Sequence, residues 1–388
     1  MKVIFVTRGW PTEANPMSGN FEAVQARALA KRGHDVTVIY IQKKSIVHFF
    51  QSKDVRYKEI DGITVLSSSV TLAEIPKLGI TKYNNCDLRI RQRAFARVYE
   101  YYRKMKGDAD VIHAHYLNQA YDCKAVLEKY HIPFIITEHW SKMNSDTVDS
   151  RIVKLTKAYQ WADKVICVSS ALSDSLKKKF GVESTVIHNM VSDRFFDRLG
   201  ADNVPKNDKN TRFVSVGSLV EGKGFDVLIR AFQKSAHLSE CQLTIIGGGP
   251  EENNLNKLIE RFGLKGRVVL TGRKPPEVVS ESLSQADCFV LTSRGETFGV
   301  VYIEAMAKGR PVIATICGGP EAFVNDKNGI LVPVDDVDAT ARAIDYMVEN
   351  KARYDSEGIR QYCYEHFSEE HTVKETIAIY KQVIEQHK

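Results

Sequence analysis

The sequence predicts an α/β protein of two doubly wound domains, each a parallel β-sheet with helices on both faces. Its 388 residues exceed what a single hydrophobic core usually supports. Short apolar runs rich in β-branched residues alternate with helical stretches along the chain, a pattern typical of parallel sheets. A polar stretch at 198–211 separates two series of such runs and predicts a linker.

Each series contains apolar runs that we expect to be buried strands. In the first half they are residues 2–6, 35–41, 110–114, 133–137, 164–168 and 184–188. In the second half they are residues 212–217, 241–247, 267–272, 287–292, 311–314 and 329–332. The expected organisation is an N-terminal domain over 1–197 and a C-terminal domain over 212–368. Ligands of such sheets bind beyond the carboxyl ends of the strands, so two facing sheets predict a cleft.

The composition is that of a soluble enzyme. Because 43% of the residues are hydrophobic, 26% are charged and no tract is biased, disordered and fibrous classes are excluded. No apolar run approaches the ~20 residues of a membrane span, and the first apolar run is too short for a signal peptide. The 7 cysteines show no paired spacing, so we expect reduced thiols in a cytoplasmic protein.

A run of glycines, Gly247 to Gly249, follows an expected strand and precedes a helical stretch. Without Cβ atoms the backbone can approach an anion closely, and the helix start offers free amides, although a tight turn explains the run equally well. The run is neither G-x-G-x-x-G nor a Walker loop, and no dinucleotide fingerprint follows the first strand. These absences count against NAD-dependent and kinase-type chemistry.

Glu296 and Glu304 are spaced to serve one site. Glu296 lies in the loop after the strand expected at 287–292, Gly299 can open a helix, and Glu304 lies roughly 7–8 Å along that helix. The free amides at the helix start can hold a diphosphate between the two carboxylates. Solvated glutamates are the alternative reading, which fits Glu304 poorly because its neighbours are apolar.

With this pair, the segments 217–224 and 318–333 make the chain resemble a family 4 glycosyltransferase of the GT-B fold, of the bacterial cell-envelope or exopolysaccharide type. The segments 16–39, 110–116 and 136–140 resemble that family's N-terminal domain, as does VIHNMV at 186–191. The resemblance implies retaining transfer of a sugar from a nucleotide-diphosphate sugar to a hydroxyl of a glycan or lipid-linked acceptor, in cell-surface polysaccharide synthesis. It implies no metal or other cofactor, and it favours a UDP-sugar over a GDP-sugar. A last helix, about 369–388, is expected to cross back onto the N-terminal domain.

The resemblance also assigns roles to matching residues. Glu296 lies beside the donor sugar, His115 lies near the reacting sugar, and Lys223 binds the diphosphate. Glu304 accepts the ribose hydroxyls. The other expected donor-binding positions are Gly19, Gly217, Ser218, Gly248, Arg273, Lys274, Phe298, Gly299 and Val300.

Position 218 departs from the family pattern. Members usually carry Arg directly after the glycine that corresponds to Gly217, and this chain has Ser218. A serine cannot replace the fixed charge and the fork of a guanidinium. Either another cation fills the place, with Arg8 and Arg273 as candidates, or the diphosphate is held more weakly.

Two patterns are typical of metal sites but predict none here. His113 and His115 lack a third ligand at recognisable spacing. The D-x-D matches at 108–110 and 336–338 fall at a strand entrance and a helix start, where Asp has structural uses. His139 is either a residue of the acceptor cleft or a buried structural histidine. Two other classes remain open, a nucleotide-sugar epimerase and a sugar-nucleotide-binding protein without activity.

The basic surplus is confined to the first half, since residues 1–195 carry 30 Lys and Arg against 20 Asp and Glu and the remainder carries a net charge of −4. Part of that surplus lies in a helical stretch at 87–106, where basic and aromatic residues interleave. Such a helix either lies on an anionic membrane or is ordinary architecture with a solvated face. We expect no nucleic-acid partner, and a peripheral contact with the inner face of the plasma membrane through this helix.

Overall fold

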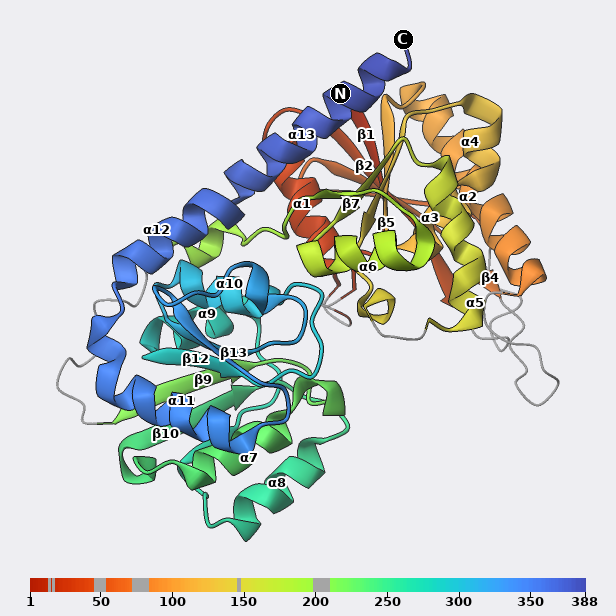
Figure 1. Cartoon of the computed structure of the whole chain (residues 1–388). Helices are drawn as coiled ribbons and strands as arrows, with labels where there is room; N and C mark the ends of the chain where they lie inside the picture. The colour runs from red at the N-terminus through yellow and green to blue at the C-terminus, as the bar shows by residue number, and fades with distance from the viewer. Residues whose placement is uncertain (13–14, 16–17, 45–53, 72–83, 145–147, 198–209) are drawn as a thin grey trace. The chain divides into compact units, whose positions relative to one another are not determined.

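The computed structural model describes the chain except for residues 13–14, 16–17, 45–53, 72–83, 145–147 and 198–209. The chain divides into two compact units, residues 1–188 with 372–388 and residues 189–371 (Figure 1). Nearly all of the linker predicted at 198–211 lies outside the described residues, so the linker stays a prediction.

The first unit is built on an 8-stranded sheet in the order β3-β4-β2-β1-β5-β6-β7-β8. Its strands are β1 Lys2–Val6, β2 Asp35–Lys44, β3 Arg56–Ile60, β4 Ile63–Thr71, β5 Val111–His115, β6 Phe134–Glu138, β7 Lys164–Cys167 and β8 Thr185–Val186. Its helices are α1 Asn20–Ala30, α2 Asn85–Lys106, α3 Leu117–Asp122, α4 Lys124–Tyr130, α5 Ser150–Val153 and α6 Ser170–Phe180. Central β1 is apolar throughout its buried part, and Ile4 and Phe5 are fully buried.

A hairpin of β3 and β4 was missed by the sequence analysis, and it supplies the antiparallel pair of this sheet. Its turn is Asp61-Gly62, with φ of 55° and 74°. An Asp-Gly pair between apolar residues is a strong hairpin signal, because both turn positions require positive φ. That dipeptide could therefore have located the hairpin. The run predicted at 184–188 forms only the short strand β8.

The second unit contains a 6-stranded parallel sheet in the order β11-β10-β9-β12-β13-β14. Its strands are β9 Thr211–Val216, β10 Cys241–Ile246, β11 Val268–Leu270, β12 Cys288–Leu291, β13 Val312–Thr315 and β14 Gly329–Val332. Its helices are α7 Phe225–Lys234, α8 Glu252–Arg261, α9 Pro276–Gln285, α10 Val300–Ala307, α11 Val337–Asn350 and α12 Ser356–Phe367. Two Rossmann-like sheets are thus confirmed, while the cleft between them stays a prediction.

The last helix, α13 Glu369–Gln386, returns to the first unit from Thr372 onward (Figure 1). Its buried face includes Thr376 and Tyr380. Gln25 Nε2 of α1 donates to Thr376 Oγ1 at 3.3 Å, and Tyr380 Oη lies 2.7 Å from His113 Nδ1 on β5. The predicted return of the C-terminal helix is confirmed.

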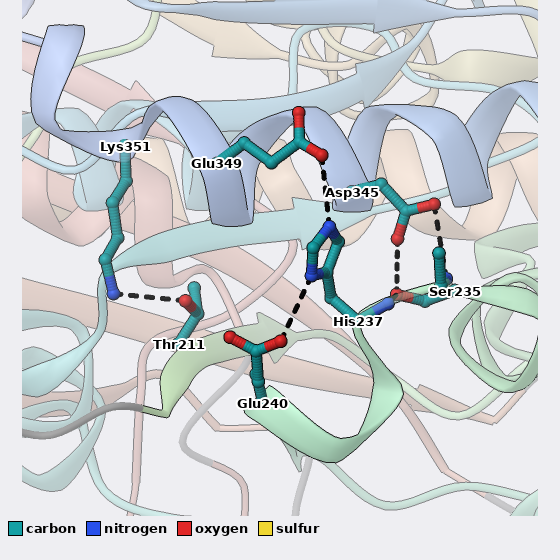
Figure 2. A network of polar contacts seen from close by, with 8 residues as sticks. Thr211, Ser235, His237, Glu240, Asp345, Glu349 and Lys351 are labelled. Carbon is teal, nitrogen blue, oxygen red and sulfur yellow. Dashed lines mark hydrogen bonds and ion pairs between the residues drawn. The ribbon is translucent and has the colours of Figure 1, made fainter.

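Helix α11 is fastened to the second sheet by a polar network (Figure 2). His237 lies between two carboxylates, with Nδ1 at 3.2 Å from Glu240 Oε1 and Nε2 at 3.1 Å from Glu349 Oε1. Ser235 Oγ donates to Asp345 Oδ1 at 2.5 Å. These contacts fix one end of α11 against the loop that precedes β10.

Candidate active site

The candidate site lies where the strand order of the second sheet reverses. Strand β9 is followed in the chain by β10 on one side, and β12 is followed by β13 on the other side. The chain therefore leaves this point of the sheet in opposite directions. Open parallel sheets bind ligands at such a switch point, beyond the carboxyl ends of the strands. The loops that follow β9 and β12 are residues 217–224 and 292–299. They contain six of the predicted site residues: Gly217, Ser218, Lys223, Glu296, Phe298 and Gly299.

Backbone contacts hold these two loops together. Thr292 Oγ1 donates to the carbonyl O of Gly224 at 2.7 Å, and the amide of Arg294 donates to the carbonyl O of Gly222 at 2.8 Å. Gly224 has φ of 62°, and a Cβ there would lie 2.0 Å from the carbonyl O of Thr292. Only glycine fits that position, because a side chain would push the loops apart.

The same contact brings Lys223 and Glu296 together. Lys223 Nζ donates to Glu296 Oε1 at 2.5 Å, and Ser293 Oγ donates to the same oxygen at 2.7 Å. The Lys223 side chain is 26% exposed and the Glu296 side chain is 11% exposed. Two predicted site residues, one cationic and one anionic, therefore form a single partly buried pair.

Helix α10 begins beside this pair. Gly299 has φ of 95°, and no side chain caps the helix. A Cβ at position 299 would lie 2.6 Å from the Tyr302 ring, so the tight entry needs glycine. The Phe298 side chain is fully buried, which leaves only its backbone for a ligand. Uncapped amides at a helix start attract anions, and Val300 is the first residue of the helix.

Glu304 lies within α10 and is half-buried. Burial raises the pKa of its carboxyl from the ordinary 4.5 to about 8, and the charge of Arg194 acts in the opposite direction. Among the contacts of the described residues, none involves the Glu304 carboxylate oxygens. A carboxyl so placed can accept hydroxyl donors from a ligand.

The glycine run has a packing explanation that the sequence did not give. A Cβ at Gly247 would lie 1.8 Å from the carbonyl O of Gly217, and one at Gly249 would lie 2.4 Å from that of Leu219. The run therefore lets the loops after β9 and β10 touch. At Gly248, in contrast, the nearest atoms belong to the flexible Arg273 side chain.

The loop after β11 supplies exposed cations on the same side of the sheet. Arg273 Nη2 approaches the carbonyl O of Gly248 at 3.5 Å, and that oxygen also accepts the Leu219 amide at 3.3 Å. Ser218 and Lys274 are exposed. Arg273 is thus the predicted cation that the structure places beside the loop containing Ser218.

Two predicted site residues belong to the first unit. Gly19 caps α1 with φ of 68°, and a Cβ there would lie 2.1 Å from the carbonyl O of Gly9. His115 ends β5, and its Nδ1 lies 3.1 Å from His139 Nε2. His115 Nε2 is buried and has no hydrogen-bond partner. Desolvation lowers the pKa of His139 to about 3 and that of His115 well below its usual range, so both rings are neutral.

Several contacts at the site were not anticipated from the sequence. Tyr380 contacts His113 although 267 residues separate them, so no local pattern connects the two. Ser293 lies three residues before Glu296, a short spacing that the sequence analysis did not use. Within the described ranges, no group of three or more His, Cys, Asp or Glu is arranged to hold a metal, and no helix has the length and hydropathy of a membrane span. Asp336 accepts the Ala339 amide as the cap of α11. All 7 cysteines are free.

Two Rossmann-like units with a charged site at the switch point of the second sheet are the arrangement expected of a glycosyltransferase, and the family models identify this class. Residues 24–195 match the family described as Glycosyltransferase Family 4, and residues 201–365 match Glycosyl transferases group 1. The chain belongs to the family 4 glycosyltransferases.

One similar protein spans nearly the whole chain, and another matches about a third of it. The putative teichuronic acid biosynthesis glycosyltransferase TuaC of Bacillus subtilis (strain 168) is 28% identical over 364 residues, which cover 89% of this chain and 88% of TuaC. The lipopolysaccharide core biosynthesis glycosyltransferase LpsE of Rhizobium meliloti (strain 1021) is 37% identical over 140 residues, 36% of this chain and 40% of LpsE.

Solved structures agree on the fold. Sucrose-phosphate synthase from Thermosynechococcus elongatus superposes with a TM-score of 0.77 at 21% identity, covering 100% of both chains. Anabaena HepE in complex with UDP-glucose superposes with a TM-score of 0.71 at 18% identity, covering 100% of this chain and 99% of HepE. The predicted GT-B fold is confirmed.

Proposed function

We propose that the chain transfers a sugar, with retention of its anomeric configuration and without a metal ion, from a nucleotide-diphosphate sugar to a hydroxyl of a glycan or lipid-linked acceptor. The observation that carries this proposal is the Lys223–Glu296 pair beside the open start of α10. A UDP-sugar is the favoured donor, and the HepE complex with UDP-glucose supports it; a GDP-sugar is the alternative. The names of TuaC and LpsE support an acceptor in cell-surface polysaccharide synthesis.

The departing diphosphate needs positive charge where its own negative charge develops. As the bond between sugar and diphosphate stretches, a cation and oriented amides stabilise the leaving group. Lys223 supplies the cation, and the amides at Gly299 and Val300 supply the dipoles. Lys223 Nζ must turn from Glu296 toward the diphosphate, which frees one lone pair of the carboxylate for the sugar.

Glu296 orients the sugar and stabilises its developing positive charge. Ser293 keeps hold of Oε1 when Lys223 leaves, so the carboxylate stays in place. The resemblance to the family implies attack from the side of the leaving group, with a diphosphate oxygen taking the proton of the acceptor hydroxyl. Retention follows because bond formation and bond cleavage occur on the same face.

Glu304 and His115 serve as hydrogen-bonding groups in this scheme. Glu304 accepts the ribose hydroxyls of the nucleotide. His115 Nε2, buried without a partner, meets a hydroxyl of the reacting sugar. Because the His115 ring is neutral, it positions the sugar without carrying a charge.

Peripheral binding to the inner face of the plasma membrane is part of the proposal. The aromatic residues Phe95, Tyr99 and Tyr102 of α2 are buried in the core, so they are not available to a membrane. Arg89 and Arg93 remain exposed on one face. Tyr101 and Met105 of α2 are also exposed, so the contact combines these two apolar side chains with electrostatic attraction of about 1 kcal/mol for each nearby cation.

Co-sedimentation with anionic vesicles at low and high salt tests the membrane contact. Replacement of Arg89, Arg93 and Arg97 by Gln should abolish binding at low salt. A control with Lys234, Lys257 and Lys265 of the second unit replaced by Gln removes the same charge and should keep binding. Equal vesicle binding by both variants would contradict membrane binding through α2, and the helix would then have a structural role alone.

Incubation with a panel of radiolabelled UDP- and GDP-sugars in EDTA, with and without membrane-extracted glycan acceptors, tests the reaction. Labelled glycan appearing only with acceptor supports transfer. A changed sugar still attached to the nucleotide indicates an epimerase, and binding without turnover indicates an inactive binding protein. If no transfer occurs in EDTA and an added divalent ion restores it, the reaction requires a metal and this part of the proposal is wrong.

A further inference from the structure

The first unit contains a cavity of about 490 Å³ that the proposed roles do not use in full. Its lining comes from the loop after β1, the end of β2 and the starts of α2 and α3. Strand β1 lies between β2 and β5, so the cavity lies at the switch point of the first sheet. Its volume falls within the ~300–1,000 Å³ usual for small-molecule sites.

Hydrogen-bond donors predominate in this cavity. Arg8, Lys43 and Arg91 are cationic lining residues, and Asn118 adds an amide. Asp87 is the one carboxylate among the described lining residues, and it already accepts Asn84 Nδ2 at 2.8 Å. A neutral sugar offers about as many donors as acceptors, whereas an oxyanion offers acceptors alone, so this lining matches an oxyanion better.

Two buried carboxylates outside the lining of the cavity form ion pairs with Arg8 and Arg91. Glu22 is 1% exposed and accepts Arg8 Nε at 3.2 Å, and Asp122 accepts Arg91 Nε at 2.8 Å. The Arg8 guanidinium also lies 4.2 Å from the centre of the Tyr116 ring. Glu22 thus contacts the Nε edge of the Arg8 guanidinium, and the Tyr116 ring contacts its face. The Arg8 side chain is 39% exposed, and its two terminal nitrogens can bind a ligand.

Gln119, a second feature of the lining, favours a hydroxyl group on the ligand. Gln119 is 6% exposed, and its Oε1 is buried with no hydrogen-bond partner. An unsatisfied buried acceptor destabilises the protein, and a ligand hydroxyl that donates to it would remove that cost. The lining thus calls for an oxyanion and a hydroxyl on one molecule.

We infer that the acceptor is an acidic sugar, whose carboxylate or phosphate is bound by Arg8 and whose hydroxyl donates to Gln119. This inference rests on the proposed function, since it gives the class of acceptor for the transfer. Glu22 positions Arg8, and Tyr116 fixes the plane of its guanidinium.

Calorimetric titration of the full chain tests this. The probes are glucuronic acid, galacturonic acid and glucose 6-phosphate, with glucose and galactose as neutral matches. At least one acidic sugar should bind roughly tenfold or more tighter than its neutral match. Preference for uronate or for phosphate then identifies the oxyanion. Equal affinities, or no binding of any acidic probe, would overturn the inference.

Variants locate the effect. Arg8→Gln should remove the preference for acidic sugars, and Gln119→Leu should weaken acidic and neutral sugars alike. Lys178→Gln, which removes an exposed charge of α6 outside the cavity, should keep the preference. Because Arg8→Gln leaves Glu22 buried without its partner, the wild type is also titrated in rising NaCl, which should weaken the acidic probes only. A preference that survives either test contradicts the role of Arg8.

Titrations with UDP and with GDP in the same samples separate this inference from the proposed function. Binding of either nucleotide without a preference for acidic sugars overturns the proposed class of acceptor but does not contradict glycosyl transfer. Preference for acidic sugars without binding of any nucleotide overturns glycosyl transfer and leaves the anion site standing.

Discussion

Lys223 Nζ lies 2.5 Å from Glu296 Oε1, although 73 residues separate the two in sequence. In the free protein the cation is therefore held by the carboxylate beside which the sugar is expected to bind. A hydrogen bond between an ammonium and a carboxylate is roughly twice as strong as one between neutral groups. Donor binding must exchange it for a contact between Lys223 and the diphosphate, which links the positioning of the sugar to the arrival of the leaving group.

Replacing Lys223 by Ala should weaken UDP binding by about 1.5–3 kcal/mol, because a charge-assisted contact with the diphosphate is lost. Titration calorimetry measures the change. Lys234→Ala is the matched control, since Lys234 is an exposed lysine of the same unit paired with Asp338. Affinity unchanged by the Lys223 variant would remove Lys223 from the diphosphate site.

Replacing Glu296 by Gln should lower turnover much more than it lowers UDP binding, because the carboxylate acts on the sugar. The amide keeps the shape and can still accept from Ser293, so the loop should stay folded. Steady-state rates with a saturating donor, compared with UDP affinity, measure the two effects. Turnover equal to wild type would refute the role given to Glu296.

Replacing Ser218 by Arg should tighten UDP binding if the site merely lacks a charge. The exposed Ser218 side chain leaves room for the change. If Arg273 supplies the missing charge, Arg273→Gln should weaken UDP binding in the wild type and have less effect beside Ser218→Arg. A loss of UDP binding in Ser218→Arg would show that another side chain already occupies the place.

Glu304 should make both stability and nucleotide binding depend on pH. Its folded pKa of about 8 lies above the ordinary 4.5, so the folded protein keeps a proton that the unfolded chain releases between these values. The free energy of unfolding should therefore fall as pH rises across that window. UDP affinity should rise toward pH 9, because the ionised carboxyl accepts ribose hydroxyls better. Glu304→Gln should flatten both profiles; unchanged profiles would contradict the assignment.

His237 should stabilise the second unit at low pH. Hydrogen bonds to Glu240 and Glu349 raise its pKa above the ordinary 6.5 (Figure 2). Its contribution is therefore complete below pH 6.5 and is lost as pH rises through the folded pKa. Thermal unfolding of His237→Gln should differ from wild type at pH 5.5 and converge with it by pH 9. A constant difference would indicate a role independent of charge.

Except for β3 and β4, the strands of both sheets could be predicted from the sequence, because each contains a short apolar run. The hairpin of β3 and β4 was missed because half of it is exposed, and β3 lacks an apolar run. The return of α13 was expected only from resemblance. Its apolar stripe shows that it must be buried, and the contact of Tyr380 with His113 shows where.

The candidate site was predicted in part. Gly299 was expected to open a helix, and it precedes α10 with φ of 95°. Gly224, with φ of 62°, was matched only as part of the segment 217–224. The Lys223–Glu296 pair could not be read from spacing, because it depends on how the loops after β9 and β12 meet. The burial of Gln119 Oε1 without a hydrogen-bond partner likewise depends on packing around α3. The cavity could therefore not be predicted from the sequence.

Proton NMR of the anomeric position in the first product tests the central claim most directly. Wild-type protein, a UDP-sugar of known configuration and acceptor are mixed in EDTA, and the coupling constant of the transferred sugar is read before the product reacts further. We predict a glycoside with the anomeric configuration of the donor, formed at the rate of UDP release. An inverted glycoside, or an epimerised nucleotide sugar without any glycoside, would contradict the account.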